Sequence, residues 1–333
     1  MTLLTFLIPC YNVSDCVAHC LDSILSQSQY HDRIEVLAIN DGSKDSTLAI
    51  LKDYEQRFSN VVRVLDKANG GWGTVINLGI REAKGKYLKE IDADDWIESE
   101  NLGRYLDRLA QLDCDYIATE YKDYMKATDS FIPHTYQPAC YDDDCSMADF
   151  WAKYPKAWAF PIHAITYRTE LLQRIRLTVG DRYYTDLEYI MYPLPYVEHI
   201  CVLPINVSVY FHGNDEQSTG PIGYRKHYQN YLDLVKKLIT FYHNLPTPTL
   251  PAVKECLRQN IQGITNFSYL LILSPLYAGR TEGIRQERRQ YDQWIKLHAS
   301  EFYAPGNKVK KSGIPYIAVW RKLGINLLSL KNA

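Results

Sequence analysis

The first hundred residues alternate short apolar runs with amphipathic stretches, and every apolar run ends in a polar or glycine-containing loop. The runs cover residues 3–8, 34–39, 61–65 and 87–91. Strands that alternate with helices at this spacing predict a parallel sheet with right-handed crossovers. The sequence therefore predicts an α/β fold with a mostly parallel, Rossmann-like sheet flanked by helices, and a helical pattern after residue 224 predicts a helical C-terminal extension.

Polar residues stand directly after the predicted strands, at Asn12, Asp41 and Asp92. In open α/β sheets, ligands bind outside the carboxyl ends of the strands, so these three loops should converge on one edge of the sheet. A glycine-rich loop at residues 69–73 is expected beside them. Its glycines permit close backbone approach to a phosphate or ribose, although an ordinary turn that starts a helix would use the same residues.

The fourth run ends in an acidic cluster, with Asp92, Asp94 and Asp95 inside four consecutive positions. Carboxylates this close repel one another unless a cation or strong donors offset their charge. Oxygen-rich clusters suit Mg²⁺ or Mn²⁺, which are hard ions that also hold substrate phosphates. A turn or helix cap is the alternative, since Asp favours both, and the cluster by itself does not decide between them.

Composition excludes several classes of protein. The formal net charge is -2 over 333 residues, so nothing in the charge balance indicates a nucleic-acid partner. Eight cysteines occur without a C-x-x-C pair, which favours reduced, mostly buried thiols in a cytoplasmic protein. The apolar N-terminus is too short for a signal peptide, and no apolar run is long enough for a transmembrane helix.

The remainder of the chain is less informative. Residues 1–220 are predicted to form one domain and residues 221–333 a second, helical region. Residues 123–146 are polar and are expected to be irregular. Basic residues beside aromatic and aliphatic ones near Trp320 and Arg321 indicate either a surface that lies on an anionic membrane or a packed C-terminal helix, and the sequence leaves both open.

The order of five motifs resembles the family 2 glycosyltransferases, which are inverting enzymes with a GT-A fold. The resemblance covers roughly the first 215 residues, and it is specific because the motifs occur together in the same order. The motifs are Pro9-Cys10-Tyr11-Asn12; Asn40-Asp41-Gly42-Ser43-Lys44-Asp45-Ser46-Thr47; Asn69-Gly70-Gly71 with Asn77-Leu78-Gly79; Ala83-Lys84-Gly85-Lys86-Tyr87; and the DxD motif Asp92-Ala93-Asp94-Asp95.

This resemblance implies a role for each matched position. Asp41 would accept a hydrogen bond from a uracil N–H, Asp94 would ligate Mn²⁺ or Mg²⁺ on the diphosphate, and Asp186 would be the catalytic base. Many members have Glu-Asp where this chain has Thr185-Asp186. His212 would complete the metal site, or would simply bond within its loop. The implied nucleotide-sugar-binding residues are Pro9, Tyr11, Asn12, Asp41, Asn69, Gly70, Gly71, Asp92 and Ala93.

The implied activity is the transfer of a single hexosyl or N-acetylhexosaminyl group from a UDP-sugar to a hydroxyl of a glycan, glycolipid or glycoprotein acceptor in bacterial surface-glycan synthesis. The Gln-x-x-Arg-Trp motif of processive relatives does not occur. Residues 221–333 would contact the acceptor, a second copy of the chain or the inner face of the cell membrane. The alternative is a catalytically silent GT-A module that binds nucleotide or scaffolds another transferase.

Overall fold

A computed structural model describes residues 2–136, 142–154, 159–213, 218–278 and 283–330. The chain forms two compact units, Met1–Gly213 and Asn214–Ala333. The strands of the first unit are β1 (Leu4–Cys10), β2 (Ile34–Asn40), β3 (Val62–Asp66), β4 (Tyr87–Glu90), β5 (Trp96–Ile97), β6 (Tyr116–Met125), β7 (Ser130–His134), β8 (Asp142–Ser146), β9 (Ile165–Arg168) and β10 (His199–His212). Its helices are α1 (Val17–Leu25), α2 (Thr47–Arg57), α3 (Trp72–Glu82), α4 (Leu102–Gln111), α5 (Met147–Lys153), α6 (Thr169–Arg174) and α7 (Asp186–Met191).

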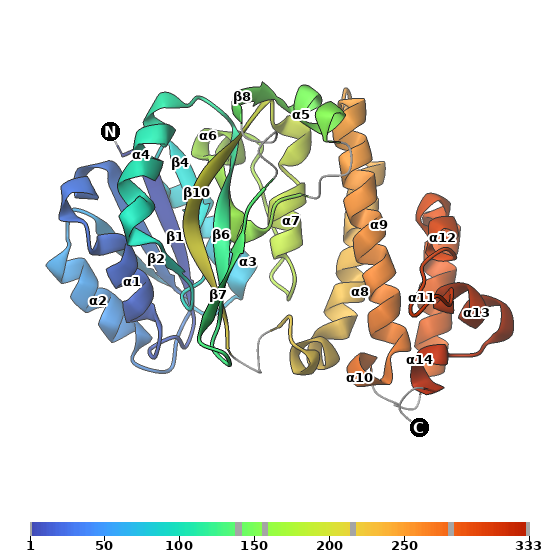
Figure 1. The fold of residues 1–333 in the computed structure, drawn as a ribbon. Coiled ribbons are helices and arrows are strands. Elements are labelled where there is room, and N and C mark those ends of the chain that lie inside the picture. The colour runs from blue at the N-terminus through green and yellow to red at the C-terminus, as the bar shows by residue number, and fades with distance from the viewer. Residues whose placement is uncertain (1, 137–141, 155–158, 214–217, 279–282, 331–333) are drawn as a thin grey trace. The chain divides into compact units, whose positions relative to one another are not determined.

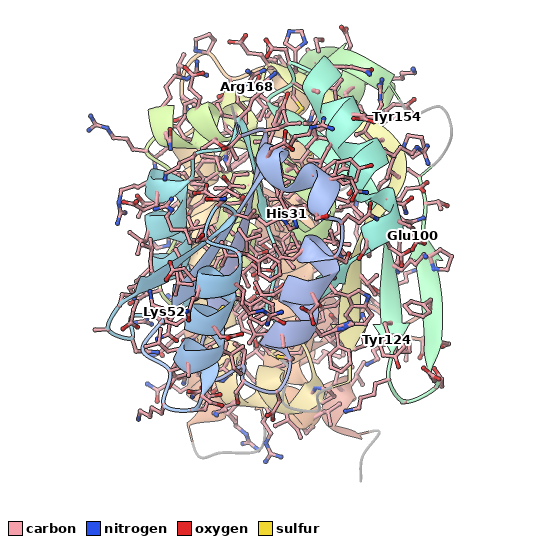
Figure 2. The ribbon with its side chains drawn as sticks, turned by 90° about the vertical axis from the view of Figure 1, so that its left-hand side faces the viewer. His31, Lys52, Glu100, Tyr124, Tyr154 and Arg168 are labelled. Atoms are coloured by element: carbon pink, nitrogen blue, oxygen red, sulfur yellow. The ribbon has the colours of Figure 1, made fainter. Side chains whose placement is uncertain are left out.

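The strands form one sheet in the order β3-β2-β1-β4-β9-β6-β10-β5, with β7 beside β6 and β8 beside β10. The registers show that β1, β2, β3, β4, β6 and β10 run in one direction, whereas β5, β7, β8 and β9 run against them. The predicted α/β class with a mostly parallel sheet is therefore confirmed. Figure 2 labels Arg168 and Tyr124 near opposite ends of the strands, and Tyr124 marks the end at which the parallel strands finish.

Helices cover both faces of the sheet (Figure 1). Alternate residues of β1 and β2 form a buried core with α1, α2 and α4, because a strand buried on both faces sends successive side chains to opposite sides. On the other face, Gly79 of α3 packs so closely on Leu7 that an added Cβ would lie 2.3 Å from it. Gln173 of α6 donates to the Ile80 carbonyl at 2.9 Å, which fixes α6 beside α3.

The prediction of an irregular segment over residues 123–146 is wrong for its described part. Strand β6 continues beyond the predicted strand, and the chain turns back as β7. Cross-strand rings hold this hairpin, with Tyr121 stacked on His134 at 4.4 Å and Tyr124 against Phe131 at 5.0 Å between centroids. Such pairs stabilise a sheet without the regular apolar alternation that would have revealed the strands in the sequence.

The second unit is helical, as predicted for the extension. Its helices are α8 (Pro221–His243), α9 (Pro251–Leu273), α10 (Pro275–Ala278), α11 (Ile284–His298), α12 (Ser300–Gly306), α13 (Tyr316–Leu323) and α14 (Leu327–Leu330). Both long helices begin with proline, which is favoured at the first helical position because its fixed φ suits the helix and its missing N–H is not needed there. Figure 1 shows α8 and α9 side by side.

The sequence left open whether the C-terminal tail packs as a helix or lies on a membrane, and in the structure part of the tail is packed. Arg321 is a packing residue, because its guanidinium bonds to Asp292 at 2.7 Å and lies 3.5 Å from the centroid of the Tyr303 ring. Ile317 on the same helix is fully buried. No helix in the described ranges has both the length and the apolar character needed to cross a bilayer.

Seven cysteines lie in the described residues as thiols, and five of them are buried. This agrees with the prediction that most of the cysteines are buried, and their reduced state stays a prediction.

Candidate active site

Asp41 lies directly after β2, where its buried carboxylate holds the glycine-rich loop in place. It accepts hydrogen bonds from the backbone N–H groups of Gly70 at 2.9 Å and Gly71 at 2.8 Å, and from the ammonium group of Lys67. The Asn69 side chain donates to the Asp41 carbonyl at 2.9 Å. A carboxylate offers about four acceptor positions, so three donors leave about one for a ligand.

The loop after β1 is joined to the loop after β2. Asn12 has a left-handed backbone with φ of 52°, which Asn tolerates better than most residues. Its side-chain oxygen accepts from the Lys44 N–H at 2.8 Å, and its own N–H donates to the Ser43 hydroxyl at 3.0 Å. Pro9 is half-buried in β1, whereas Tyr11 is 46% exposed. The loop therefore presents the Tyr11 ring at the edge where the strands end.

The turn after β4 concentrates negative charge that the protein only partly offsets. Burial, followed by the charge of Asp94, raises the pKa of Asp92 to about 7. Two donors reach Asp92: the indole of Trp72, and the carboxyl of Glu90, whose own pKa burial raises well above its usual range. Ala93 is buried within the turn. A cation would relieve the remaining repulsion.

Strand β10 ends alongside this turn, and His212 is its last residue. The Phe211 N–H donates to the buried Asp95 carboxylate at 2.8 Å, which ties β10 to the turn. The ring of His212 lies with Nε2 3.2 Å from Asp123 Oδ1 on β6. Among the residues that the structure describes, no three His, Cys, Asp or Glu side chains form a group that could hold a metal ion by themselves. The metal role of His212 stays a prediction.

Asp186 is the first residue of α7 and is half-buried. Burial raises its pKa to about 6, and its charge in turn raises the pKa of Asp92. The two carboxylates are therefore within electrostatic reach of each other, although they are far apart in the chain. Tyr184, two residues earlier, has a left-handed backbone with φ of 69°. Such strain in a bulky residue is often found where a functional side chain must be presented.

Sequence reasoning missed three supporting residues of this site. Lys67 follows β3 at the same sheet edge where Asp41 follows β2, and that placement was the available signal. The sequence places Glu90 in a strand and gives no sign of its contact with Asp92. Burial raises the pKa of Glu90, and no sequence motif indicates this. Lys89 is buried, and its ammonium donates to the His163 carbonyl at 2.7 Å; burial lowers its pKa to about 7.

The sequence model described as "Glycosyl transferase family 2" matches residues 5–174. The chain belongs to glycosyl transferase family 2. The matched range contains the loops at Asn12, Asp41 and Asn69 and the acidic turn at Asp92, and it ends before Asp186. This match confirms the family that the sequence motifs resembled. The activity of that family is glycosyl transfer.

Curated relatives carry glycosyltransferase names. The chain is 39% identical over 103 residues to the poly(ribitol-phosphate) beta-glucosyltransferase of Bacillus spizizenii, covering 31% of this chain and 16% of that protein. It is 23% identical over 255 residues to glycosyltransferase GlyA of Streptococcus pneumoniae, covering 74% of this chain and 35% of that protein. It spans 32% of the glycosyltransferase MG025 homolog of Mycoplasma pneumoniae, at 42% identity over 96 residues and 28% of this chain. The alignments thus cover well under half of each relative.

Solved structures confirm the GT-A fold. S. aureus TarS 1-349 in complex with UDP superposes with a TM-score of 0.62 at 16% identity, over 96% of this chain and 86% of that chain. The mannosyltransferase PcManGT of Pyrobaculum calidifontis, in complex with GDP-Man and Mn2+, superposes with a TM-score of 0.53 at 16% identity, over 93% and 88% of the two chains. At these identities the likeness concerns the fold alone.

Proposed function

We propose that this chain is an inverting, metal-dependent glycosyltransferase that moves a single sugar from a UDP-sugar to a hydroxyl group of a glycan, glycolipid or glycoprotein acceptor in bacterial surface-glycan synthesis. The observation that carries the proposal is the meeting of Asp186 with the acidic turn at one sheet edge, where the charge of Asp186 raises the pKa of Asp92. UDP, UDP-GlcNAc and GDP-Man occupy structures with the same fold, which supports a nucleotide-sugar donor.

The loops at Asp41 and Tyr11 would bind the nucleotide. The remaining acceptor position of the Asp41 carboxylate suits a base N–H, and Tyr11 offers an exposed aromatic face for the base. Asp41 already orders the backbone at Gly70 and Gly71, so donor binding would not carry the entropic cost of ordering this loop.

Asp186 would act as the base. A carboxylate with a pKa of about 6 is ionised near neutral pH and still accepts a proton readily. It would take the proton of the acceptor hydroxyl while the hydroxyl oxygen forms its bond to C1 of the sugar. The bond from C1 to the diphosphate oxygen would break, and UDP would leave. Attack from the face opposite the leaving group inverts C1, so an α-linked donor would give a β-linked product.

The acidic turn fits a divalent cation. Asp92 and Asp94 would hold it, because Mg²⁺ and Mn²⁺ are commonly bound by one or two carboxylates together with substrate phosphates rather than by a full set of protein ligands. Burial and the neighbouring charge of Asp94 raise the pKa of Asp92, and a bound cation would favour its ionised form. When bound there, such an ion would offset the charge of the departing diphosphate.

Release of UDP tests this proposal most directly. We expect slow release of UDP from one member of a panel of UDP-sugars with Mn²⁺ present and no acceptor, and we expect EDTA to abolish it. If no UDP-sugar is turned over and UDP itself does not bind, the proposal is wrong.

Replacement of one carboxylate distinguishes the enzyme hypothesis from the hypothesis of a catalytically silent scaffold. Asp94→Ala should abolish transfer while the protein stays folded, because the cation would lose a ligand. Unchanged function in cells that carry Asp94→Ala would support the scaffold instead.

The tail of the second unit would contact an anionic membrane surface. Residues 302–333 contain six basic residues and no acidic one. Ile314 and Leu323 are 47% and 66% exposed, and Lys308, Lys310, Lys311 and Lys322 are also exposed. Exposed apolar side chains among lysines suit a lipid surface, where the lysines meet headgroups. Sedimentation with anionic but not neutral vesicles would support this contact, and equal sedimentation would contradict it. Self-association through residues 221–333 stays a prediction.

A further inference from the structure

The segment that leads into α7 is held by side chains of α3. Asn77 exchanges two hydrogen bonds with the backbone of Val179: its amide nitrogen donates to the Val179 carbonyl at 2.9 Å, and its amide oxygen accepts from the Val179 N–H at 2.9 Å. This pattern imitates the pairing of two strands. It fixes the position of the chain seven residues before Asp186, between elements that lie 102 residues apart in sequence.

The glycines at the start of α3 make room for the same segment. A Cβ at Gly73 would lie 1.6 Å from the Gly180 carbonyl oxygen, and a Cβ at Gly71 would lie 2.5 Å from that of Asp181. Contacts this short cannot be relieved by a side-chain rotation because the opposing atoms belong to the backbone. The glycines of the loop therefore admit the chain's own backbone at close range.

Glu188 of α7, which follows the segment in the chain, also binds the start of the segment. Its buried carboxylate accepts from the Gly180 N–H at 2.7 Å. Thr185, which precedes Asp186, donates its hydroxyl to the Arg182 carbonyl at 2.9 Å. The segment is thus bonded to α3 and α7 at its start, and a bond within it joins Thr185 to Arg182. No regular secondary structure covers residues 179–185, so these bonds supply the order that a helix or strand would otherwise provide.

We propose that Asn77 and Glu188 are positioning residues that fix the segment 179–185 on α3 and thereby set Asp186 at the donor site. This inference rests on the proposed role of Asp186 as the base. Helix α3 also carries Trp72, whose indole donates to Asp92 and whose ring meets Tyr189 of α7 at 6.5 Å between centroids. One helix thereby connects the donor side and the base side of the site. A displacement of about 1 Å in a reacting group can cost on the order of 100-fold in rate.

The first test replaces Asn77. In the full-length protein, Asn77→Ala should lower kcat by about 10- to 100-fold, whereas the dissociation constant of UDP with Mn²⁺ should change less than about twofold. Asn101→Ala is the matched control, because the Asn101 amide donates to the Asn206 carbonyl at 2.9 Å in the same unit and away from this segment. Equal values of kcat for Asn77→Ala and Asn101→Ala would overturn the role of Asn77.

The second test uses Glu188 and does not depend on the folding of the Asn77 variant. Glu188→Gln keeps an oxygen that accepts from the Gly180 N–H and should retain most of kcat, whereas Glu188→Ala should lose it to the same extent as Asn77→Ala. Equal activity of the two Glu188 variants would overturn the positioning role.

Asp186→Asn distinguishes failure of this inference from failure of the proposed function. Full activity in Asp186→Asn would contradict the role of Asp186 as the base, and with it the proposed mechanism. Loss of activity in Asp186→Asn, with normal kcat in Asn77→Ala and Glu188→Ala, would contradict only the positioning role of Asn77 and Glu188.

Discussion

Burial is the main cause of the raised pKa of Asp186, the proposed base, and the charge of Glu188 adds to it. Burial disfavours the ionised form of a carboxylate, and here it raises the pKa to about 6. Asp41 illustrates the opposite use of a buried carboxylate, because its oxygens are occupied mainly by donors of the protein itself. The two acids look alike in the sequence, and their different surroundings agree with the different roles proposed for them.

The pH dependence of transfer should follow the ionisation of Asp186. The ionised form is the active one, so kcat should be high above the folded pKa and should fall as the pH drops through about 6. Measurement of kcat at saturating donor and acceptor between pH 5 and 8 tests this, since these limits bracket the pKa by about one unit or more. A rate that stays constant down to the lower limit would contradict the assignment.

Asp41→Asn should weaken donor binding through the loop that Asp41 orders. An amide group has one oxygen, so its NH₂ would face the N–H of Gly70 or Gly71, and a buried donor would lose its partner at a cost of about 1–3 kcal/mol. We expect the dissociation constant of UDP, measured by calorimetry, to rise about tenfold or more. Asp53→Asn is the control, because Asp53 forms an exposed ion pair with Arg57 on α2, away from the glycine-rich loop. Similar UDP affinity in both variants would contradict this role.

At the scale of elements, α3 does more than cover the sheet. Its start is joined to the acidic turn through Trp72, and its middle is joined to the segment before α7 through Asn77. The β6–β7 hairpin similarly brings Asp123 beside His212 at the end of β10. These links connect side chains that are proposed to be functional and that come from distant parts of the chain.

Gly73→Ala should reduce activity even though alanine favours a helix over glycine by about 1 kcal/mol. The added methyl group would meet the Gly180 carbonyl at 1.6 Å, so the segment before Asp186 must move. We expect kcat to fall by about 10-fold or more and Tm not to rise. Unchanged kcat with a higher Tm would show that the segment can move without harm to the site.

At the scale of the whole molecule, the residues proposed for donor binding and catalysis all lie in the unit Met1–Gly213. This unit contains the complete sheet and a buried core on both sheet faces, so it has the size and core expected of an independent domain. The second unit has its own buried network around Arg321, Asp292 and Tyr269. The predicted division at residue 220 and the functional roles of the two regions remain proposals.

A chain that ends at Gly213 should fold and bind UDP. We expect a single cooperative unfolding transition and a dissociation constant of UDP within about threefold of that of the full-length protein, because no residue proposed for nucleotide binding is removed. Circular dichroism and calorimetry would measure both. An unfolded truncated chain would show that the first unit does not fold by itself, and a folded chain without UDP affinity would contradict the assignment of nucleotide binding to this unit.

The sequence by itself determined the α/β class, the order of the strand-end loops and the family. These follow from local patterns: apolar runs of strand length, polar residues at the carboxyl end of each run, and motifs that lie within a few residues of one another. The loops at Asn12, Asp41 and Asp92 were predicted to converge, with the Asn69 loop beside them. Hydrogen bonds in the structure join the Asp41 loop to the Asn12 loop and to the Asn69 loop.

Only the tertiary structure decided how these groups are supported. The glycines at 71 and 73 were expected to admit a ligand, and they admit the backbone of Asp181 and Gly180. The ring of His212 lies beside Asp123, and burial raises the pKa of Glu90, whose carboxyl lies against Asp92. Each of these facts depends on a partner distant in the chain or on the degree of burial. Both arise when the sheet and α3 pack together, and no local pattern in the sequence encodes them.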